Sequence, residues 1–597
     1  MNVLEHIASL RQKMSENAID AYIVPSADNH QSEYVGNHFK AVEFITGFTG
    51  EAGDVIVTKD EVGLWTDARF FLQAEHQLEG TGVTLYRIGE PNVPTMAEFL
   101  ERVLPVNGTL GFDGRVVAMQ EGQSYAETFA SKQINIKYSF DLIGDIWTNR
   151  PPLSTKPAFL LAEKYTGEST SSKLVRIRDV MNNEGATAHI ITSLDDICWV
   201  INMRGDDVEY SPLLLTYLII RKDSADLFID ENKLDNDAKA ILTKLNFVLH
   251  PYNDIYEAVK TFSADDTILI DPRKINYAIY NNIPQSTKKV EKPNPTILYK
   301  AMKNDVEIQN IIQAHIKDGV AISRFMHWVK TTVGREKITE ISAAKKLDNF
   351  RQMGEGYLWQ SFAPICGYKE HAAIVHYSAT PETDVELEPN GLFLTDTGGN
   401  YYEGSTDITR THILGPITEE ERTHFTAVAK STLNLANARF LYGCRGYNLD
   451  ILARQPIWDL SIDYKHGTGH GVGYLLNIHE GPTGFRWQIN PARDEAHPFE
   501  AGMVITDEPG IYIAGSHGVR TENELVVRAD NANEYGQFMH FETITYAPID
   551  LDGINPDQMS IEEKSRLNSY HNMVFEVLSP HMDEEEQEWL RTYTRKI

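Results

Sequence analysis

Two segments in the first half of the chain share one pattern of apolar and polar positions. In "LRQKMSENAIDAYIVPSADN" an amphipathic helix, a short turn and an apolar strand follow one another, and "IRDVMNNEGATAHIITSLDD" has the same order. Later, "TLGFDGR" (Thr109–Arg115) parallels "TILIDPR" (Thr267–Arg273), each an apolar strand followed by Asp-x-Arg. Because strand and helix signals alternate in both segments, the pattern predicts two copies of one α/β domain. Chance similarity of common strand–helix patterns is the alternative.

The rest of the chain has a different pattern. It opens with "NDVEIQNIIQAHIKDGVAISRFMHWVKTTV", where apolar residues recur at steps of three and four, as in a long amphipathic helix. Hairpin-like strands and glycine turns follow, and the tail from Ile561 to Ile597 is predicted to be helical. This third part is therefore expected to form a separate domain with a C-terminal helical extension from about residue 556.

Two proline-marked breaks divide these parts. They are "NRPPLSTKPA" (Asn149–Ala158) and "EKPNPTILYKAM" (Glu291–Met302). A length of 597 residues is too great for one core and fits about three domains. We therefore predict domains at 1–155, 156–297 and 298–597.

Composition narrows the classes of partner and compartment. The chain is 42% hydrophobic and 23% charged, which is ordinary for a globular protein, and its net charge is −30. Such an acidic chain is not expected to bind nucleic acid or anionic membranes. Three widely spaced cysteines indicate no disulfide framework, and no apolar signal core or run of about 18 apolar residues occurs. We expect a cytoplasmic protein.

The most unusual local composition lies in "DYKHGTGHGVGYLLNIHEGP" (Asp463–Pro482), which contains His466, His470 and His479. Histidines four residues apart suit a metal site on a helix, but each glycine costs about 1 kcal/mol in a helix interior. Glycine instead favours unusual backbone angles or close approach of the backbone to another group. We therefore expect an irregular turn that projects histidines into a site, with a flexible loop and solvated histidines as the alternative.

Two pairs of acidic residues lie in hairpin-like contexts. Asp396 ends an apolar strand and Asp407 lies in the returning strand, with the midpoint near Tyr401 and Tyr402. Glu508 and Glu522 have their midpoint at Gly515, inside another turn. Each pair is expected to be directly opposed across its hairpin.

Opposed like charges on half-buried strands need compensation, because the pairing itself is destabilising. Four carboxylates carry a charge of −4, which two divalent cations would balance. The glycine turn can add the imidazole of His470. An oxygen-rich shell with one imidazole favours Mn²⁺, with Co²⁺, Fe²⁺ or Zn²⁺ as alternatives. Two such ions sharing a water would turn it into a nucleophile.

At these residues the sequence resembles a known family. The set Asp396, Asp407, His470, Glu508 and Glu522 is similar to the dinuclear site of the pita-bread metallopeptidases, which include methionine aminopeptidase, prolidase and aminopeptidase P. The resemblance to the large, three-domain form of aminopeptidase P covers nearly the whole chain. Its motifs are "HQSEY", "LWTDARFFLQA", "NMRGDDVEY", "IVHYSA", "HGTGHGVG", "IHEGP", "TDEPGIY" and "RTEN". The resemblance implies two similar creatinase-type α/β domains followed by a pita-bread catalytic domain.

The resemblance also implies a role for each metal ligand. Asp396 and Asp407 would bind one metal, and Asp407 would also reach towards the other. His470 and Glu508 would complete the shell of the second metal, and Glu522 would bridge. Glu508 would also take up a proton from the bridging water during attack.

Five further residues would serve the substrate. His376 would stabilise the peptide or the tetrahedral intermediate, and His479 would assist proton transfer near the leaving proline nitrogen. His466 would line the proline pocket, or merely pack against the metal shell. Tyr512 and Arg520 would lie close by, with Arg520 orienting either the substrate or an acidic metal ligand.

The function that the resemblance implies is a metal-dependent Xaa-Pro aminopeptidase. It would remove the first residue from peptides with proline at the second position, and it would act as a homodimer. One alternative is a prolidase, which cleaves Xaa-Pro dipeptides. Duplicated N-terminal domains and the total length favour the aminopeptidase. The other alternative is a non-catalytic pita-bread binding protein, which the complete set of five ligands disfavours.

Overall fold

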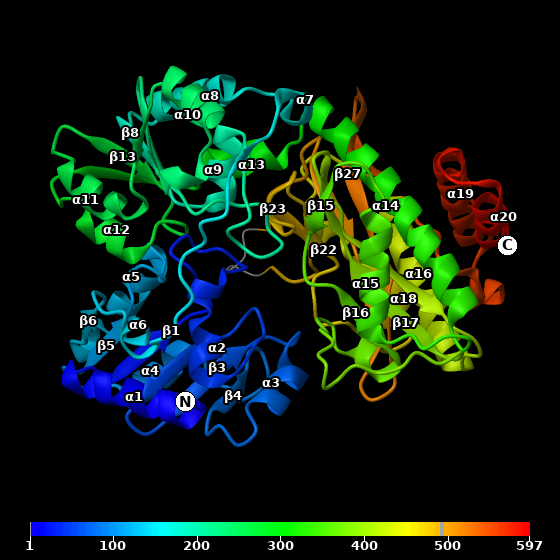
Figure 1. The fold of residues 1–597 in the computed structure, drawn as a ribbon, viewed down its shortest axis with the longest axis horizontal. Helices are drawn as coiled ribbons and strands as arrows, with labels where there is room; N and C mark the ends of the chain where they lie inside the picture. Colours follow the sequence, from blue (N-terminus) through cyan, green and yellow to red (C-terminus); the bar gives the residue numbers. More distant parts are fainter. Residues whose placement is uncertain (1, 490–494) are drawn as a thin grey trace. The chain divides into compact units, whose positions relative to one another are not determined.

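The computed structural model describes residues 2–489 and 495–597, and the chain divides into two compact units (Figure 1). We call Met1–Leu161 with Glu168–Thr296 the N-terminal unit. Ala162–Gly167 with Ile297–Ile597 form the C-terminal unit. Among the described helices, none is both long enough and apolar enough to cross a membrane.

The N-terminal unit contains two six-stranded sheets with one topology. Their strand orders are β4-β3-β2-β1-β5-β6 and β12-β11-β10-β8-β13-β14. In both, the central strand pairs antiparallel with one neighbour and parallel with the other, and the outer pairings correspond as well. The predicted internal repeat is therefore confirmed. The strands are β1 (Ala21–Val24), β2 (Asp54–Thr58), β3 (Val62–Thr66), β4 (Thr84–Arg87), β5 (Thr109–Phe112), β6 (Asn135–Lys137), β8 (Ala188–Ile191), β10 (Tyr217–Arg221), β11 (Ala225–Phe228), β12 (Phe247–His250), β13 (Thr267–Ile270) and β14 (Lys288–Glu291).

Helices pack on both sheets, and a two-stranded ribbon of β7 (Phe159–Leu160) and β9 (Met203–Arg204) completes this unit. The first helix of each copy begins at a side-chain cap, Asn2 in one and Ser169 in the other. The helices are α1 (Val3–Glu16), α2 (Ala41–Thr46), α3 (Phe71–Gln77), α4 (Met96–Val103), α5 (Met119–Thr128), α6 (Leu142–Ile146), α8 (Thr170–Asn183), α9 (Leu194–Ile201), α10 (Asn236–Lys244), α11 (Ile255–Ala258) and α12 (Tyr277–Asn282).

Two motif residues outside the predicted catalytic set serve this fold. His30 is buried between the two sheet domains, where Nδ1 lies 2.7 Å from the carbonyl oxygen of Thr192 and Nε2 lies 2.6 Å from the hydroxyl of Tyr252. Because a carbonyl only accepts, Nδ1 donates and Nε2 accepts. Arg204 is also buried and donates to the carbonyl oxygen of Cys198. Both residues therefore join parts of the N-terminal unit to one another.

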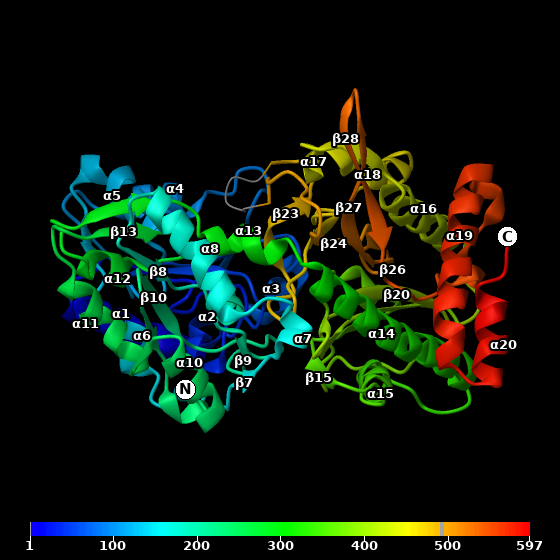
Figure 2. The ribbon, with the colours of Figure 1, turned by 90° about the horizontal axis from the view of Figure 1, so that it is seen from above.

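The C-terminal unit is built around the predicted long helix, α14 (Asp305–Thr332) (Figure 2). Asn304 and Glu307 form a capping box at its start, and the side-chain amide of Asn304 also donates to Thr166 of α7. This contact ties the short segment Ala162–Gly167 to this unit. The other helices are α7 (Glu163–Thr166), α13 (Pro295–Ala301), α15 (Glu340–Arg351), α16 (Glu419–Ala436), α17 (Gly446–Leu449), α18 (Ile451–Trp458), α19 (Ile561–Leu578) and α20 (Glu584–Tyr593).

Four sheets make up the rest of this unit, in the orders β15-β18-β19, β16-β17-β20, β21-β28-β27-β24-β22-β23 and β25-β26. One apolar core contains residues of α16, α19 and α20 together with residues of the hairpin β25–β26. The C-terminal helices α19 and α20 therefore pack into the same core as this hairpin. The strands are β15 (Tyr357–Gln360), β16 (Ile365–Tyr368), β17 (Leu392–Thr397), β18 (Gly399–Tyr401), β19 (Gly404–Ser405), β20 (Ile408–Ile413), β21 (Arg439–Leu441), β22 (Gly469–Gly471), β23 (Glu480–Phe485), β24 (Val504–Asp507), β25 (Gly510–Ile513), β26 (His517–Arg520), β27 (Asn523–Asn533) and β28 (Gly536–Thr543).

Candidate active site

The histidine-rich glycine stretch is non-helical, as predicted. It contains the short strand β22, which lies between β23 and β24. A Cβ atom on Gly469 would lie 1.9 Å from the carbonyl oxygen of Thr506, and one on Gly471 would lie 2.1 Å from that of Glu480. These two glycines are therefore required because the strands approach too closely for a side chain. Because neither glycine has a Cβ, the backbone can pass between the neighbouring strands and hold His470 at this point.

The first acidic hairpin differs in register from the prediction. In the ladder of β17 and β20, Asp396 pairs with Thr409, while Asp407 lies just before β20. The prediction that Asp396 and Asp407 are directly opposed is therefore wrong. Asp407 lies two residues from the partner of Asp396, at the diagonal position, which long or charged side chains can still span. The inner strands β18 and β19 continue the same register to a turn at Tyr402 and Glu403.

The second acidic hairpin agrees with the predicted register. Asp507 pairs with Asn523 in the ladder of β24 and β27, and Gly510 pairs with Arg520 in the ladder of β25 and β26. Both ladders belong to one continuous register. Extended across the break between them, this register places Glu508 opposite Glu522.

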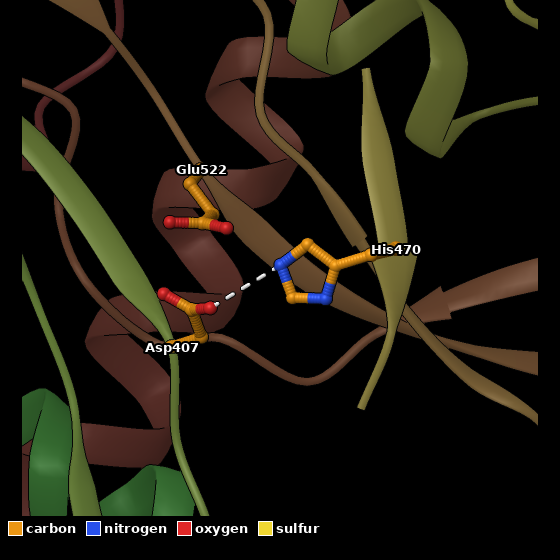
Figure 3. A group of neighbouring side chains, drawn as sticks. All are labelled: Asp407, His470 and Glu522. Atoms are coloured by element: carbon orange, nitrogen blue, oxygen red, sulfur yellow. Dashed lines mark ion pairs between the residues drawn. The ribbon is translucent and has the colours of Figure 1, made fainter. Parts of the chain in front are cut away.

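Three of the five predicted ligands form a compact cluster. One ligand atom from each of Asp407, His470 and Glu522 lies within 4.8 Å of the other two, as Figure 3 shows. His470 Nε2 is 3.5 Å from Asp407 Oδ2 and 3.7 Å from Glu508 Oε1. His470 Nδ1 lies 2.9 Å from the carbonyl oxygen of Gly471, which can only accept. Nδ1 therefore bears the proton, and Nε2 presents its lone pair to the carboxylates, as a metal ligand requires.

The electrostatics of the cluster favour cation binding. Burial, followed by repulsion from Asp396 and Glu508, raises the pKa of Asp407 well above its ordinary value. Burial and the charge of Asp407 raise the pKa of Glu522 in the same way. The Oδ1 atom of Asp396 is buried and has no hydrogen-bond partner among the described residues. A donor set of carboxylates with one oriented imidazole fits divalent ions, which would offset both the burial and the repulsion.

A chain of polar contacts links Asp396 to the predicted substrate residues. Arg520 Nη2 donates to Asp396 Oδ2 at 2.5 Å, and Arg520 Nη1 donates to the Tyr512 hydroxyl at 2.7 Å. That hydroxyl lies 2.9 Å from His466 Nε2. Arg520 is buried, so its contact with Asp396 supports the expectation that it orients an acidic ligand. Burial raises the pKa of Tyr512 to about 12, and burial together with the nearby Arg520 charge lowers the pKa of His466.

The two remaining histidines border the same region. The ring of His479 lies 4.2 Å from that of His470, edge to face at 76°. His376 is close enough to His466 for its charge to lower the pKa of that ring. The residue before it, Val375, accepts a hydrogen bond of 3.4 Å from Arg520 through its carbonyl oxygen. The structure thus brings all ten predicted site residues into one connected region of the C-terminal unit.

Sequence reasoning missed three residues that support the ligands. Glu524 Oε1 accepts a 2.8 Å hydrogen bond from the backbone N–H of Asp407, and His315 Nε2 lies 3.2 Å from the same atom. Thr409 donates to Glu522 Oε2 at 2.8 Å. Glu522 directly precedes β27 and Glu524 lies two residues on, a spacing that puts both on one face of an extended chain, and this signal was available in the sequence. No sequence pattern marks Thr409, since its role depends on the packing of the two hairpins.

Comparison with known families covers most of the chain. Residues 6–141 and residues 149–307 each match a creatinase/prolidase N-terminal domain. Residues 309–529 match metallopeptidase family M24, and residues 537–597 match the C-terminal region of peptidase M24. These assignments agree with the α/β repeat and confirm the predicted fold class.

Individual relatives align over the full length. Aminopeptidase P1 of Arabidopsis thaliana is 35% identical, and the alignment covers 99% of each chain. The crystal structure of X-prolyl aminopeptidase from Caenorhabditis elegans, described as a cytosolic enzyme with a di-nuclear active site, has 32% identity, a TM-score of 0.95 and complete coverage of both chains. A Xaa-Pro dipeptidase structure from Bacillus anthracis is 22% identical with a TM-score of 0.50, and covers 64% of this chain and 99% of its own. The chain therefore belongs to the aminopeptidase P family of M24 metallopeptidases.

Proposed function

We propose that this protein is an Xaa-Pro aminopeptidase, a metal-dependent exopeptidase that hydrolyses the bond between an N-terminal residue and a penultimate proline. The observation that supports it best is the cluster of Asp407, His470 and Glu522, extended by Glu508 and, through Arg520, by Asp396. These contacts support the assignment of all five positions to one metal site.

The five ligands would hold two divalent ions. When bound, these ions supply Lewis acidity that activates water at neutral pH and stabilises developing negative charge. Oxygen donors outnumber the single imidazole, which favours Mn²⁺ over Co²⁺, Fe²⁺ or Zn²⁺ by ligand type, although cellular supply also decides the metal. The donor atoms that fit this use most directly are the oriented Nε2 of His470 and the Oδ1 of Asp396, which has no hydrogen-bond partner among the residues that the structure describes.

The remaining residues would bind the peptide and move protons. Glu508 takes up the proton of the attacking water, because its side chain, 19% exposed, is the most accessible of the four carboxylates. His376 donates to the peptide oxygen or to the tetrahedral oxyanion. His479, beside His470, delivers a proton near the proline nitrogen as the bond breaks. His466 and Tyr512 form a wall of the proline pocket.

A proline-specific site has a clear physical purpose. The bond cleaved is a tertiary amide, so proline offers no N–H and presents a ring of fixed shape. Recognition must therefore use shape and apolar contact rather than a backbone donor. His466 suits this role because its half-buried ring, whose pKa burial lowers, is fixed by the Tyr512 hydroxyl.

The cellular setting follows from similarity. We propose a cytoplasmic location, as for the Caenorhabditis elegans enzyme. We also propose a homodimer, and a three-domain division at 1–155, 156–297 and 298–597. Prolidase activity is the second candidate, because the same five ligands serve it, but the duplicated N-terminal sheets favour the aminopeptidase.

Product analysis by mass spectrometry tests the proposal. An Arg-Pro-Pro peptide and the dipeptide Ala-Pro are each incubated with chelated protein, with and without added Mn²⁺. Release of only the first residue from the longer peptide, restored by Mn²⁺, is the expected result. Cleavage of the dipeptide alone would make the enzyme a prolidase. If neither is cleaved although metal is bound, the proposed activity is wrong.

A further inference from the structure

The segment that presents His376, residues 369–377, is held from two sides. We call it the His376 loop. It begins with the short 3₁₀ turn Lys369–Ala373 and ends at Tyr377. On one side it contacts Glu340 at the start of α15, and on the other it contacts β26.

Glu340 gathers three donors from the loop and its entry strand. Its side chain is fully buried. Oε1 accepts from the backbone N–H of Tyr368 at 2.8 Å and lies 2.9 Å from His371 Nδ1. Oε2 accepts from the Tyr377 hydroxyl at 2.8 Å and lies 3.1 Å from the same His371 nitrogen. The rings of His371 and Tyr377 are in contact, with centroids 4.6 Å apart.

The strand β26 closes the loop from the other side. A Cβ on Gly518 would lie 1.8 Å from the carbonyl oxygen of Ala372, so strand and loop are in direct backbone contact. Arg520 donates to the carbonyl oxygen of Val375. His376 therefore lies between two anchored neighbours, Val375 held by Arg520 and Tyr377 held by Glu340. Loss of the contact at Val375 or at Tyr377 would therefore allow His376 to change position.

We propose that Glu340 and His371 position His376 for the substrate, and that the ion pair between them makes this positioning dependent on pH. The proposal rests on the proposed function, since it assigns His376 to the substrate. Among the described residues, Glu340 and His371 form no hydrogen bond or ion pair with a predicted metal ligand, so they are positioning residues rather than catalytic ones. The first fixes the loop through three hydrogen bonds, and the second adds a charge that can be removed.

The direction of the pH effect follows from the surroundings of His371. Its hydrogen bond to Glu340 is the largest influence and raises the pKa of the imidazole above 6.5, against a smaller lowering by burial. The ion pair between His371 and Glu340 is therefore fully formed below pH 6.5. It weakens as the pH rises through the raised pKa of His371. The titratable and charged groups facing His371 or its partners are Glu340, Glu370, Tyr377, Asp384, Lys369, Glu388 and Arg520.

Two substitutions separate the charge from the hydrogen bond. His371→Asn keeps a side-chain donor for Glu340 but cannot titrate, and Glu340→Gln keeps the shape of the buried acid but removes its charge. Glu388→Gln is the matched control, because Glu388 pairs with Lys369 of the same loop at the surface, away from Glu340. For each protein, kcat and KM on the Arg-Pro-Pro peptide are measured from pH 6 to 9, together with bound metal and Tm.

In the wild type, kcat/KM should decrease as the pH rises. This decrease should be absent in His371→Asn, and the two proteins should have equal metal content. Glu340→Gln should lower kcat/KM by about tenfold at pH 6.5, the value of one charged hydrogen bond. The control should follow the wild type. If His371→Asn retains the full wild-type pH profile, or if Glu340→Gln lowers only Tm, the positioning role is wrong.

A second measurement keeps the inference separate from the proposed activity. In protein labelled with ¹³C at histidine rings, the NMR signal missing from His371→Asn identifies His371, and the signal missing from His376→Ala identifies His376. The pKa of His371 should fall in Glu340→Gln, and the His376 signal should shift as His371 titrates. An inactive wild type that shows both effects would overturn the activity and keep the coupling. A His376 signal that ignores the titration of His371 would overturn the coupling, whatever the activity.

Discussion

The two hairpins that supply the carboxylates place their acidic pairs differently. In the second hairpin one register continues across a break and sets Glu508 opposite Glu522. In the first, Asp396 is opposite Thr409, and Asp407 takes the diagonal position. Thr409 then occupies the place expected for an acid and donates to Glu522 of the other hairpin. The offset thus replaces one repulsive contact with a hydrogen bond that joins the two hairpins.

The difference shows that a turn, and not the acidic pair, sets the register. The first hairpin contains the extra strands β18 and β19, which fix the turn at Tyr402 and Glu403, one residue beyond the midpoint between Asp396 and Asp407. The second turns at Gly515, whose φ of 70° lies in the left-handed region that favours glycine. Glycine therefore marked one turn in the sequence, whereas no single residue marked the other.

Of the substitutions that test the two hairpins, removal of one carboxylate of the metal cluster should have the largest effect on activity. Asp407→Asn and Glu522→Gln, one from each hairpin, should each lower kcat/KM by about a thousandfold, because each deletes a ligand charge. Bound metal per chain, measured by elemental analysis, should fall in both. Glu542→Gln at the surface of β28 is the matched control. Near-normal activity and metal content in Asp407→Asn would contradict its place in the site.

Loss of the guanidinium that spans the hairpins should have the next largest effect. Arg520 belongs to the second hairpin but holds Asp396 and contacts Thr409 of the first. Arg520→Gln should weaken Mn²⁺ affinity by about 10- to 100-fold, since an outer partner of a ligand is removed. Titration calorimetry with Mn²⁺ measures this. Arg528→Gln, which breaks an exposed ion pair on β27, should leave the affinity unchanged.

Removal of the Thr409 hydroxyl, which links the two hairpins, should have a smaller effect on metal affinity. Thr409→Val removes the donor to Glu522 and should weaken metal affinity by about fivefold, which corresponds to the ~1 kcal/mol net contribution typical of one hydrogen bond. Thr411→Val is a close control on the same face of β20, because in the described part of the chain the Thr411 hydroxyl forms hydrogen bonds with the backbone of Arg520 alone. An equal loss in both variants would mean that strand packing, not the hydroxyl at the joint, determines the effect.

The buried histidines of the hairpins should show the smallest effect, on stability alone. Burial lowers the pKa of His412 in the first hairpin to about 3, and it also lowers the pKa of His517 in the second. Because the unfolded chain binds the proton first, neither histidine changes the stability of the fold above pH 6.5, and each lowers it as the pH falls below that value. For His412 the loss is about 1.4 kcal/mol per pH unit below that value.

Thermal unfolding at pH 7 and pH 5 measures this difference. The fall in Tm between the two values should be smaller in His412→Gln than in the wild type. His517→Gln should reduce it less, since His517 is the less strongly shifted of the two. Because any release of metal at pH 5 affects all three proteins alike, the differences between them isolate the histidines. A larger reduction in His517→Gln would reverse the comparison.

Local patterns predicted much of the fold. The period of three and four in α14, the two matching helix–strand units and the glycine-rich turn each depend on neighbours in sequence, and each was confirmed. The register of the first hairpin was predicted wrongly because it depends on the exact position of the turn, and no single residue marks the turn at Tyr402 and Glu403. Glu524 and His315 were missed because they meet only through folding, separated by more than 200 residues in the chain.

The sequence by itself determined the family, the domain repeat and the types of residue at the site, because these depend on residue identity and short spacing. Only the tertiary structure decided which groups touch. It placed Thr409 opposite Asp396, directed Arg520 to an acidic ligand, and set Glu340 behind the His376 loop. The physical reason is that a buried charge must find a partner, and that partner is chosen by the packing of hairpins and helices far apart in the chain.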